Sequence, residues 1–184
     1  LENIKKTIKE LSPDGLVAGN VGVLDMKLGL PVILDYNSNC FNDLQVSYYQ
    51  DKKAKPIVSP ELSLEELEGF KNKDFIVFAH GKIRLMTLAH NLQEDRLRDG
   101  LGFYFDIKKI FNGSEVLNDK ELAWFNKLRS LVKKGINQIY IDTENTNDYE
   151  EILKIYKLIL DGKTPDASKL QKNFVLGWIK YGAF

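Results

Sequence analysis

The sequence predicts an α/β fold, a (β/α) barrel of the triosephosphate isomerase type that is present in part, with about five strands plus a β-hairpin insertion. Three observations predict it: short apolar runs, helical patterns between these runs, and a spacing of about twenty residues per unit. Strands that alternate with helices form a parallel sheet with right-handed crossovers. A doubly wound sheet fits the same alternation and remains an open alternative.

Five apolar runs rich in Val, Ile, Phe and Tyr predict the strands. Each run is apolar at consecutive positions, which is typical of a strand buried on both faces of a parallel sheet. In chain order the predicted strands are 16–19, 31–35, 56–59, 75–79 and 138–142.

Helical patterns lie before, between and after these runs. Ser63 is followed three residues later by Glu66, which is the form of a capping box and predicts the start of a helix. The predicted helices are 4–11, 44–51, 64–70, 120–134 and 148–160.

Two segments depart from the alternation. The segment 100–115 predicts a hairpin insertion, because Asn112 and Gly113 supply a turn between apolar runs. The segment 173–184 is aromatic and contains glycine, and we expect it to pack as a C-terminal lid or closing segment. The whole chain, 1–184, is expected to be a single domain.

The number of strands predicts an incomplete barrel. A closed barrel needs eight strands and about 250 residues. This sequence offers five strands in 184 residues, so we expect it to be the C-terminal part of a longer barrel. The first strand, 16–19, would then have an open edge, and we expect self-association or another segment to cover that edge.

Composition excludes several classes of protein. The 26 basic and 26 acidic residues cancel, so overall charge does not indicate nucleic acid as a partner. No apolar run reaches the roughly twenty residues that span a bilayer. Cys40 is the only cysteine, which excludes an intrachain disulfide and an iron–sulfur cluster held by four cysteines of this chain. A chain without disulfides is typical of a cytoplasmic protein, so we expect this location. His80 and His90 lie ten residues apart without carboxylates at metal-site spacing, so we expect no metal and no cofactor.

Polar side chains follow the ends of the predicted strands, where the open face of a barrel lies. A carboxylate and an imidazole from neighbouring strand ends suit general acid–base chemistry, and two cations after the fourth run suit an anion. We predict that Asp35, Asn39, Glu61, His80 and Lys82 line this face. The full set of strand-end residues is Asn20, Asp35, Tyr36, Asn37, Asn39, Ser59, Glu61, His80, Lys82, Arg84, Asp142 and Glu144.

Each of these residues also has a structural interpretation. His80 is as compatible with a buried histidine whose two nitrogens are hydrogen-bonded as with a catalytic one. Ser59 is equally suited to capping a turn before Pro60. A free cysteine such as Cys40 is usually a small buried hydrophobe. Glu61 has the least ordinary position, between a strand and a capped helix, although it is also able to pair with Lys82.

Five segments in order resemble the collagenase-like proteases, the peptidase family 32 of unknown catalytic type. They are D-G-L-V-A-G-N-V-G-V-L, L-P-V-I-L-D-Y-N-S-N-C-F-N, V-S-P-E-L-S-L-E-E-L, V-F-A-H-G, and V-L-N-D-K-E-L through G-I-N-Q-I-Y-I-D-T-E. The resemblance covers residues 14 to about 162. It implies a (β/α) barrel from a family whose branches include proteases and proteins that act with partner enzymes in hydroxylating tRNA or ubiquinone precursors.

The resemblance implies that residues at the positions matching the family's motifs form the site. At other positions this sequence differs from the family's motifs. The matching elements contribute Asp35, Asn39, Asn42, Ser59, Pro60, Glu61, His80 and Gly81. Arg84 and Asn91 stand roughly where the family has cysteines after its His-Gly element. Neither iron–sulfur ligands nor a cysteine nucleophile are therefore expected in this loop. The element at 141–145 also lacks the arginine of the family pattern.

Two functions from different classes follow. The first is a peptidase-family hydrolase that acts on a peptide or protein substrate. Its catalytic residues would be Glu61, His80 and Asp35, and its substrate-binding residues Asn39, Asn42, Ser59, Lys82 and Arg84. The second is a non-catalytic or partner-dependent barrel subunit that binds peptide or RNA and is related to the hydroxylation branch of the same family.

Overall fold

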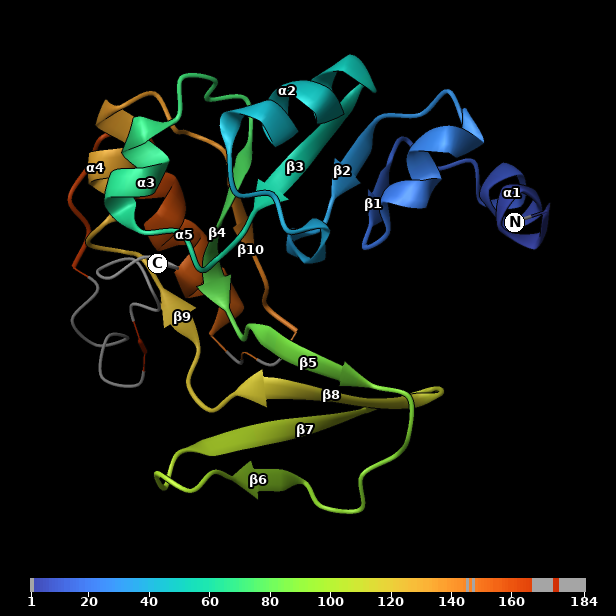
Figure 1. Cartoon of the computed structure of the whole chain (residues 1–184). Helices are drawn as coiled ribbons and strands as arrows, with labels where there is room; N and C mark the ends of the chain where they lie inside the picture. Colours follow the sequence, from blue (N-terminus) through green and yellow to red (C-terminus); the bar gives the residue numbers. More distant parts are fainter. Residues whose placement is uncertain (1, 145, 147, 167–173, 176–184) are drawn as a thin grey trace. The chain divides into compact units, whose positions relative to one another are not determined.

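The computed structural model describes residues 2–144, 146, 148–166 and 174–175, which form two compact units (Figure 1). Unit 1 comprises 2–78 and 130–140, and unit 2 comprises 79–129 with the described residues from 141 onward. The boundary falls inside strand β4 (Ile76–Gly81). The two units are described separately below.

Unit 1 is built on a parallel sheet. Its strands are β1 (Leu16–Ala18), β2 (Val32–Leu34), β3 (Ala54–Val58), the first half of β4, and β10 (Ile139–Ile141), in the order β1-β2-β3-β4-β10. The pairs β1–β2, β2–β3 and β3–β4 are all parallel. This confirms a mixed α/β class with a parallel sheet. The described residues contain no closed barrel.

The three α-helices in the first 78 residues of unit 1 lie close to the ranges 4–11, 44–51 and 64–70 that the sequence predicts. They are α1 (Glu2–Leu11), α2 (Asp43–Asp51) and α3 (Leu64–Gly69), with short 3-10 helices η1 (Val21–Met26) and η2 (Tyr36–Ser38). The capping box is confirmed, since Ser63 Oγ accepts from the Glu66 N–H and the Glu66 carboxylate accepts from the Ser63 N–H. α1 buries none of its residues.

The core of unit 1 lies between the sheet and its helices. Its fully buried side chains include Leu34, Ile57, Leu67, Phe75, Leu131 and Ile136. They come from strands, from α3 and from the segment 130–136, so that burial of apolar area joins elements distant in the sequence.

The predicted helix 120–134 is wrong over its first part. Only α4 (Leu128–Lys133) is helical, and the preceding residues contain strand β9 (Leu122–Ala123). Ala123 pairs with His80 in the antiparallel ladder between β9 and β4. The run L-A-W-F at 122–125 is buried throughout, which differs from the single buried stripe of an amphipathic helix, and its first two residues form β9.

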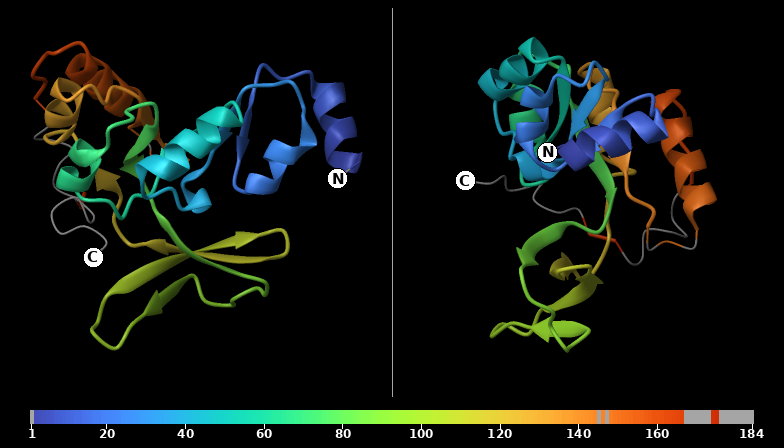
Figure 2. Two further views of the ribbon diagram at one scale, coloured as in Figure 1. Left: turned by 45° about the horizontal axis from the view of Figure 1, so that its top comes forward. Right: turned by 90° about the vertical axis from the view of Figure 1, so that its right-hand side faces the viewer.

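Unit 2 contains a separate antiparallel sheet (Figure 2). Its strands are β5 (Arg84–Leu88), β6 (Arg96–Arg98), β7 (Tyr104–Ile110) and β8 (Gly113–Asn118), in the order β5-β8-β7-β6. The hairpin predicted at 100–115 is the β7–β8 pair, which extends to Asn118 and belongs to a larger sheet. A Cβ at Gly113 would lie 1.9 Å from the Leu88 carbonyl oxygen, so only glycine lets β5 approach here.

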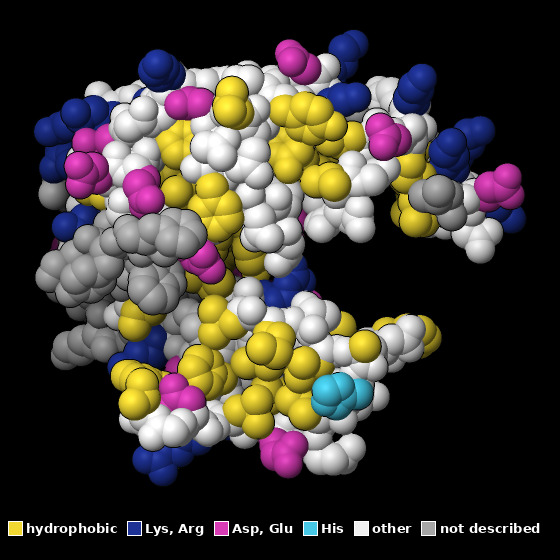
Figure 3. Space-filling view, viewed as in Figure 1, with side chains coloured by type: hydrophobic (Ala, Val, Ile, Leu, Met, Phe, Trp, Pro, Cys, Tyr) yellow, Lys and Arg dark blue, Asp and Glu magenta, His cyan; other side chains and the backbone are white. Residues whose placement is uncertain are grey.

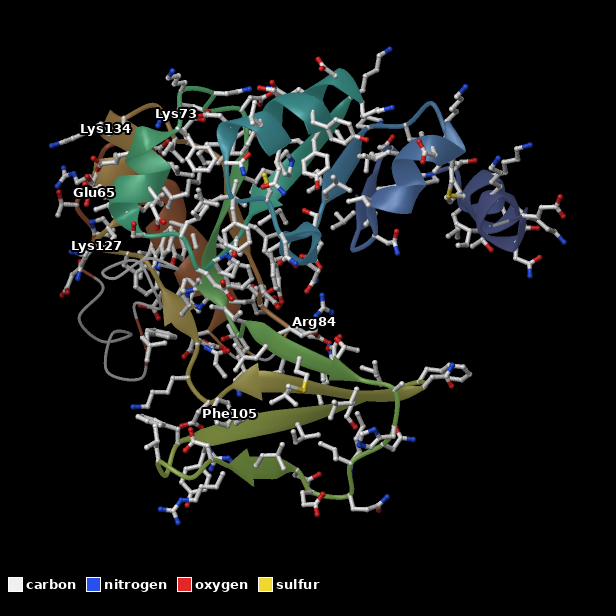
Figure 4. The ribbon with its side chains drawn as sticks, viewed as in Figure 1. Glu65, Lys73, Arg84, Phe105, Lys127 and Lys134 are labelled. Atoms are coloured by element: carbon white, nitrogen blue, oxygen red, sulfur yellow. The ribbon has the colours of Figure 1, made fainter. Side chains whose placement is uncertain are left out.

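One face of this antiparallel sheet is apolar. Met86, Val116 and Ile107 face each other across three strands, and Phe105 pairs with Leu97 on the same side. Hydrophobic side chains gather over this sheet in Figure 3. The sticks in Figure 4 place Phe105 on β7.

Helix α5 (Tyr149–Leu160) completes unit 2, close to the predicted 148–160, and buries Ile152, Ile155, Tyr156 and Ile159. Of the predicted lid 173–184, only Phe174 and Val175 are described, and the rest lies outside the described residues. No helix in the described part of the chain is long and apolar enough to cross a bilayer.

Candidate functional site

Five of the predicted site residues lie in unit 1, where most of them form hydrogen bonds or turns of the local backbone. Asp35 accepts from the Tyr36 N–H at 2.7 Å and caps η2, and Asn42 accepts from the Gln45 N–H at 3.0 Å and caps α2. Asn39 ends η2 in the left-handed conformation. Buried Ser59 accepts from the Glu61 N–H at 3.3 Å. The Glu61 side chain is exposed.

The two predicted anion-binding cations lie in unit 2 and already have carboxylate partners. Lys82 pairs with Asp106, and Arg84 pairs with Glu115 at 2.6 Å. Figure 4 labels Arg84, which lies on the strand that Figure 1 labels β5. The first pair ties the residue after β4 to β7, and the second ties β5 to β8. An incoming anion would therefore have to compete with a bound carboxylate.

A hollow in unit 1 lies away from the predicted strand-end site. It is lined by 23–25, 27–32 and 51–53, which precede β2 and β3. These are the amino ends of the strands, whereas the predicted site residues follow their carboxyl ends.

His80 is the predicted site residue with the most unusual surroundings. Its side chain is completely buried in unit 2. Its ring packs against Phe125 at 5.5 Å and Tyr156 at 5.6 Å between centroids, and also against Phe174 at 5.1 Å. We call the side chains of His80, Glu121, Phe125 and Tyr156, against which the Phe174 ring packs, the His80 pocket.

The Tyr156 hydroxyl fixes the backbone at the floor of the pocket. It donates to the Ala79 carbonyl oxygen at 2.6 Å and accepts from the Trp124 N–H at 3.0 Å. Both contacts are buried, and burial raises the pKa of Tyr156. The hydroxyl therefore keeps its proton and acts as a structural link between β4, the segment after β9, and α5.

The two nitrogens of His80 have unequal contacts. Nδ1 lies 3.4 Å from the Tyr156 hydroxyl oxygen, and Nε2 lies 3.5 Å from Oε2 of Glu121. Nε2 is buried and has no hydrogen-bond partner among the described residues. The Tyr156 hydroxyl proton is donated to the Ala79 carbonyl, so a hydrogen bond between Nδ1 and this hydroxyl requires Nδ1–H to be the donor. A neutral imidazole has a single N–H, so Nε2 then carries a lone pair and no proton.

Burial determines the charge of this imidazole. Desolvation lowers the pKa of His80 to about 4, and the Asp142 carboxylate opposes that shift only in part. The ring is therefore neutral at pH 7, and its contact with Glu121 is not an ion pair at that pH.

The carboxylate beside His80 was not predicted from the sequence. The hypothesis paired His80 with Glu61, whereas the structure brings Glu121 to it, with Glu121 Oε1 accepting from the Thr146 hydroxyl at 2.7 Å. Glu121 directly precedes the apolar run L-A-W-F, which is the signal that identifies it as a strand-flanking residue. The incorrect helix at 120–134 concealed that signal.

Cys40 has the properties of a buried structural thiol. It is fully buried in unit 1, and desolvation raises its pKa to about 12. A thiol with that pKa supplies almost no thiolate at pH 7, so it is a poor nucleophile. Across the described part of the chain, no group of three or more His, Cys, Asp or Glu side chains is arranged to hold a metal ion.

Phe174 and Val175 adjoin the His80 pocket. The Val175 N–H donates to the Glu121 carbonyl oxygen at 2.9 Å, and its carbonyl accepts from the Ala123 N–H at 3.0 Å. These bonds form a parallel bridge with Leu122 on β9. Phe174 thereby places its ring 5.8 Å from that of Phe125 as well as against His80.

No family model, curated protein or solved structure matches this chain. The case for a function therefore rests on the geometry of the His80 pocket and the strand edge beside it.

Proposed function

We propose that the chain binds an extended peptide or protein segment at the His80 pocket and β9, without hydrolysing it. One observation carries the proposal: the outer edge of β9 accepts an extended segment through two backbone hydrogen bonds beside a pocket of aromatic rings. Addition of a strand to a sheet edge, with a pocket for one side chain, is a general mode of peptide recognition. The resemblance to a peptidase family supports the same class of ligand.

The chemistry of the pocket favours binding over hydrolysis. Covalent hydrolysis needs a nucleophile that an adjacent base activates. In the described part of the chain, the hydroxyl within hydrogen-bond distance of His80 is that of Tyr156, which already donates to Ala79. Cys40 is buried with a raised pKa. The pocket therefore offers shape and apolar surface but no activated nucleophile.

Hydrolysis remains the second candidate function because one observation favours it. The His80–Glu121 contact at 3.5 Å joins a carboxylate to an imidazole that is neutral at pH 7, and a neutral imidazole is the form that accepts a proton from water. This candidate requires the other tautomer of His80, with the proton on Nε2 facing Glu121 and with Nδ1 as the base. Glu121 then replaces Glu61 and Asp35 as the carboxylate that orients His80.

We also propose a more specific fold and a cellular location for the protein. We propose that β1 to β4 and β10 are successive strands of a partial (β/α) barrel of the triosephosphate isomerase type, which their order in the chain and their side-by-side order in the sheet support. A cytoplasmic location is proposed on the single cysteine, and no cofactor is proposed.

A fluorescein-labelled tryptic digest of casein tests the function. We expect the wild type to retain labelled peptides on filtration and to release no new amino termini. His80→Gln and Glu121→Gln test the second candidate, with the exposed His90→Gln as the matched control. New amino termini that appear with the wild type and His90→Gln, but with neither pocket variant, would establish hydrolysis instead. Failure of the wild type to retain any peptide would refute the proposal.

We also propose self-association through the edge of β1. The Leu16 N–H donates to the Pro31 carbonyl oxygen, and the Ala18 carbonyl oxygen accepts from the Asp35 N–H. The residues on both sides of Val17 are therefore hydrogen-bonded to the β2 side of the strand. In a parallel ladder the Val17 N–H and carbonyl then point outward. In the described residues β1 pairs with β2 alone, and the Val17 side chain is 64 % exposed.

Substitution of Val17 tests this edge. Proline at an edge strand removes an outward N–H without removing a bond to the neighbouring strand, so we expect Val17→Pro to weaken self-association about tenfold or more. Val17→Thr keeps both the N–H and the branched shape and should associate as the wild type does. Sedimentation velocity over a range of concentrations measures the effect. A wild type that stays monomeric throughout would rule out this interface.

A further inference from the structure

We infer that Phe174–Val175 occupies the peptide site of its own chain and competes with the external ligand. The ligand is then an extended segment, parallel to β9, that places an aromatic side chain in the His80 pocket. This inference rests on the proposed function and adds to it the ligand's direction, its key side chain and its regulation.

The backbone contacts define the direction of the bound segment. A residue of a parallel strand bonds through its N–H and its carbonyl to the two residues that flank its partner. Val175 does this across Leu122, bonding to Glu121 and Ala123. The opposite edge of β9 is already used, since Ala123 pairs with His80 of β4. An external segment that adds to β9 must therefore take the place of Val175.

The side chains define what the site recognises. Successive residues of an extended segment point to opposite sides. Phe174 points to the rings of His80 and Phe125, whereas Val175 is 37 % exposed. Recognition therefore concentrates on the aromatic residue and tolerates variation at the next position.

The Phe174 side chain leaves one polar atom of the His80 pocket without a hydrogen bond. The buried Nε2 of His80 has no hydrogen-bond partner in the described part of the chain while the Phe174 ring is in place. An unsatisfied buried nitrogen weakens a complex. A ligand with a polar group near this nitrogen would gain a hydrogen bond that Phe174 does not supply, and the internal segment would then be displaced.

An internal competitor lowers the apparent affinity for every external ligand. The apparent dissociation constant equals the intrinsic one divided by the fraction of molecules whose site is open. Weakening the contact of Phe174–Val175 should therefore strengthen the binding of an added peptide, which is the opposite of what loss of a structural element would do.

Val175→Pro is the test, because proline lacks the N–H that bonds to Glu121. Val175→Ala keeps that N–H and is the matched control. The probe is the fluorescein-labelled hexapeptide K-N-F-V-L-G, which repeats residues 172–177 and whose binding is followed by fluorescence anisotropy. We expect Val175→Pro to bind the probe about tenfold more tightly than the wild type or Val175→Ala. The probe K-N-A-V-L-G should bind Val175→Pro at least about tenfold more weakly than K-N-F-V-L-G.

Phe174→Ala is a second way to open the site, and it applies if Val175→Pro fails to fold by circular dichroism. Equal affinity of the wild type and the opened variants for the probe would overturn the inference. So would an absence of probe binding by every variant. If no variant binds the probe but the wild type retains the casein digest, the inference fails and the proposed function stands. If no variant binds the probe and the wild type does not retain the casein digest, both the inference and the proposed function are refuted.

Discussion

Replacing Gly81 with alanine is expected to lower the free energy of unfolding by about 2–5 kcal/mol. The backbone of Gly81 has a φ of +120°, which other residues rarely adopt. A Cβ there would lie 2.6 Å from the Asp142 Cβ and 2.8 Å from the Asp142 carbonyl oxygen. Asp142 cannot move away freely, because its N–H donates to the His80 carbonyl at 2.9 Å.

Urea denaturation followed by far-ultraviolet circular dichroism measures this effect. Gly100→Ala is the matched control in the same unit, since no atom lies within 4 Å of its added Cβ, and its stability should change by no more than about 0.5 kcal/mol. Equal urea midpoints for the two variants would contradict the expected clash. The approach of Asp142 thus explains why this position is glycine.

Protonation of His80 is expected to remove about 3 kcal/mol of stability between pH 6.5 and pH 4. Burial lowers the pKa of His80 in the folded state from 6.5 to about 4. The unfolded chain therefore takes up the proton first as the pH falls. The contribution of neutral His80 is complete above pH 6.5, decreases below it, and is lost once the pH reaches the folded pKa.

Stability measured from pH 7.5 to pH 4 in wild type and His80→Gln isolates this contribution. Subtracting the two curves removes the titration of the carboxylates that they share, and the difference should show the loss assigned to His80. His90→Gln is the matched control, because it replaces a histidine whose side chain is exposed. Parallel curves for wild type and His80→Gln would mean that His80 is not desolvated in the folded state.

The parts of the fold that the sequence predicted depend on local chemistry. The five strands appear within about two residues of the apolar runs that predicted them, because each run is rich in β-branched or aromatic residues. Helix α3 begins at the predicted residue, since Ser63 and Glu66 satisfy each other's backbone donors over one turn.

The parts that the sequence did not predict depend on contacts between distant residues. The segment 120–127 has enough helix-forming residues to suggest a helix, yet pairing of Ala123 with His80 makes part of it a strand. The meeting of Glu121 with His80 follows from that pairing. Asp35 and Asn42 cap helices within a few residues of their own positions, and no pattern in a single sequence separates such caps from ligands.

The side chains of the His80 pocket and its occupant Phe174 lie on segments that are far apart in the sequence and are translated at different times. His80 is made early, Phe125 and Tyr156 follow, and Phe174 arrives last, whereas the antiparallel sheet from β5 to β8 is one continuous stretch. Domains synthesised on the ribosome fold from local contacts first, and long-range contacts form slowly. We therefore expect the antiparallel sheet to form before the His80 pocket, because the pocket joins side chains as distant in the sequence as His80 and Tyr156.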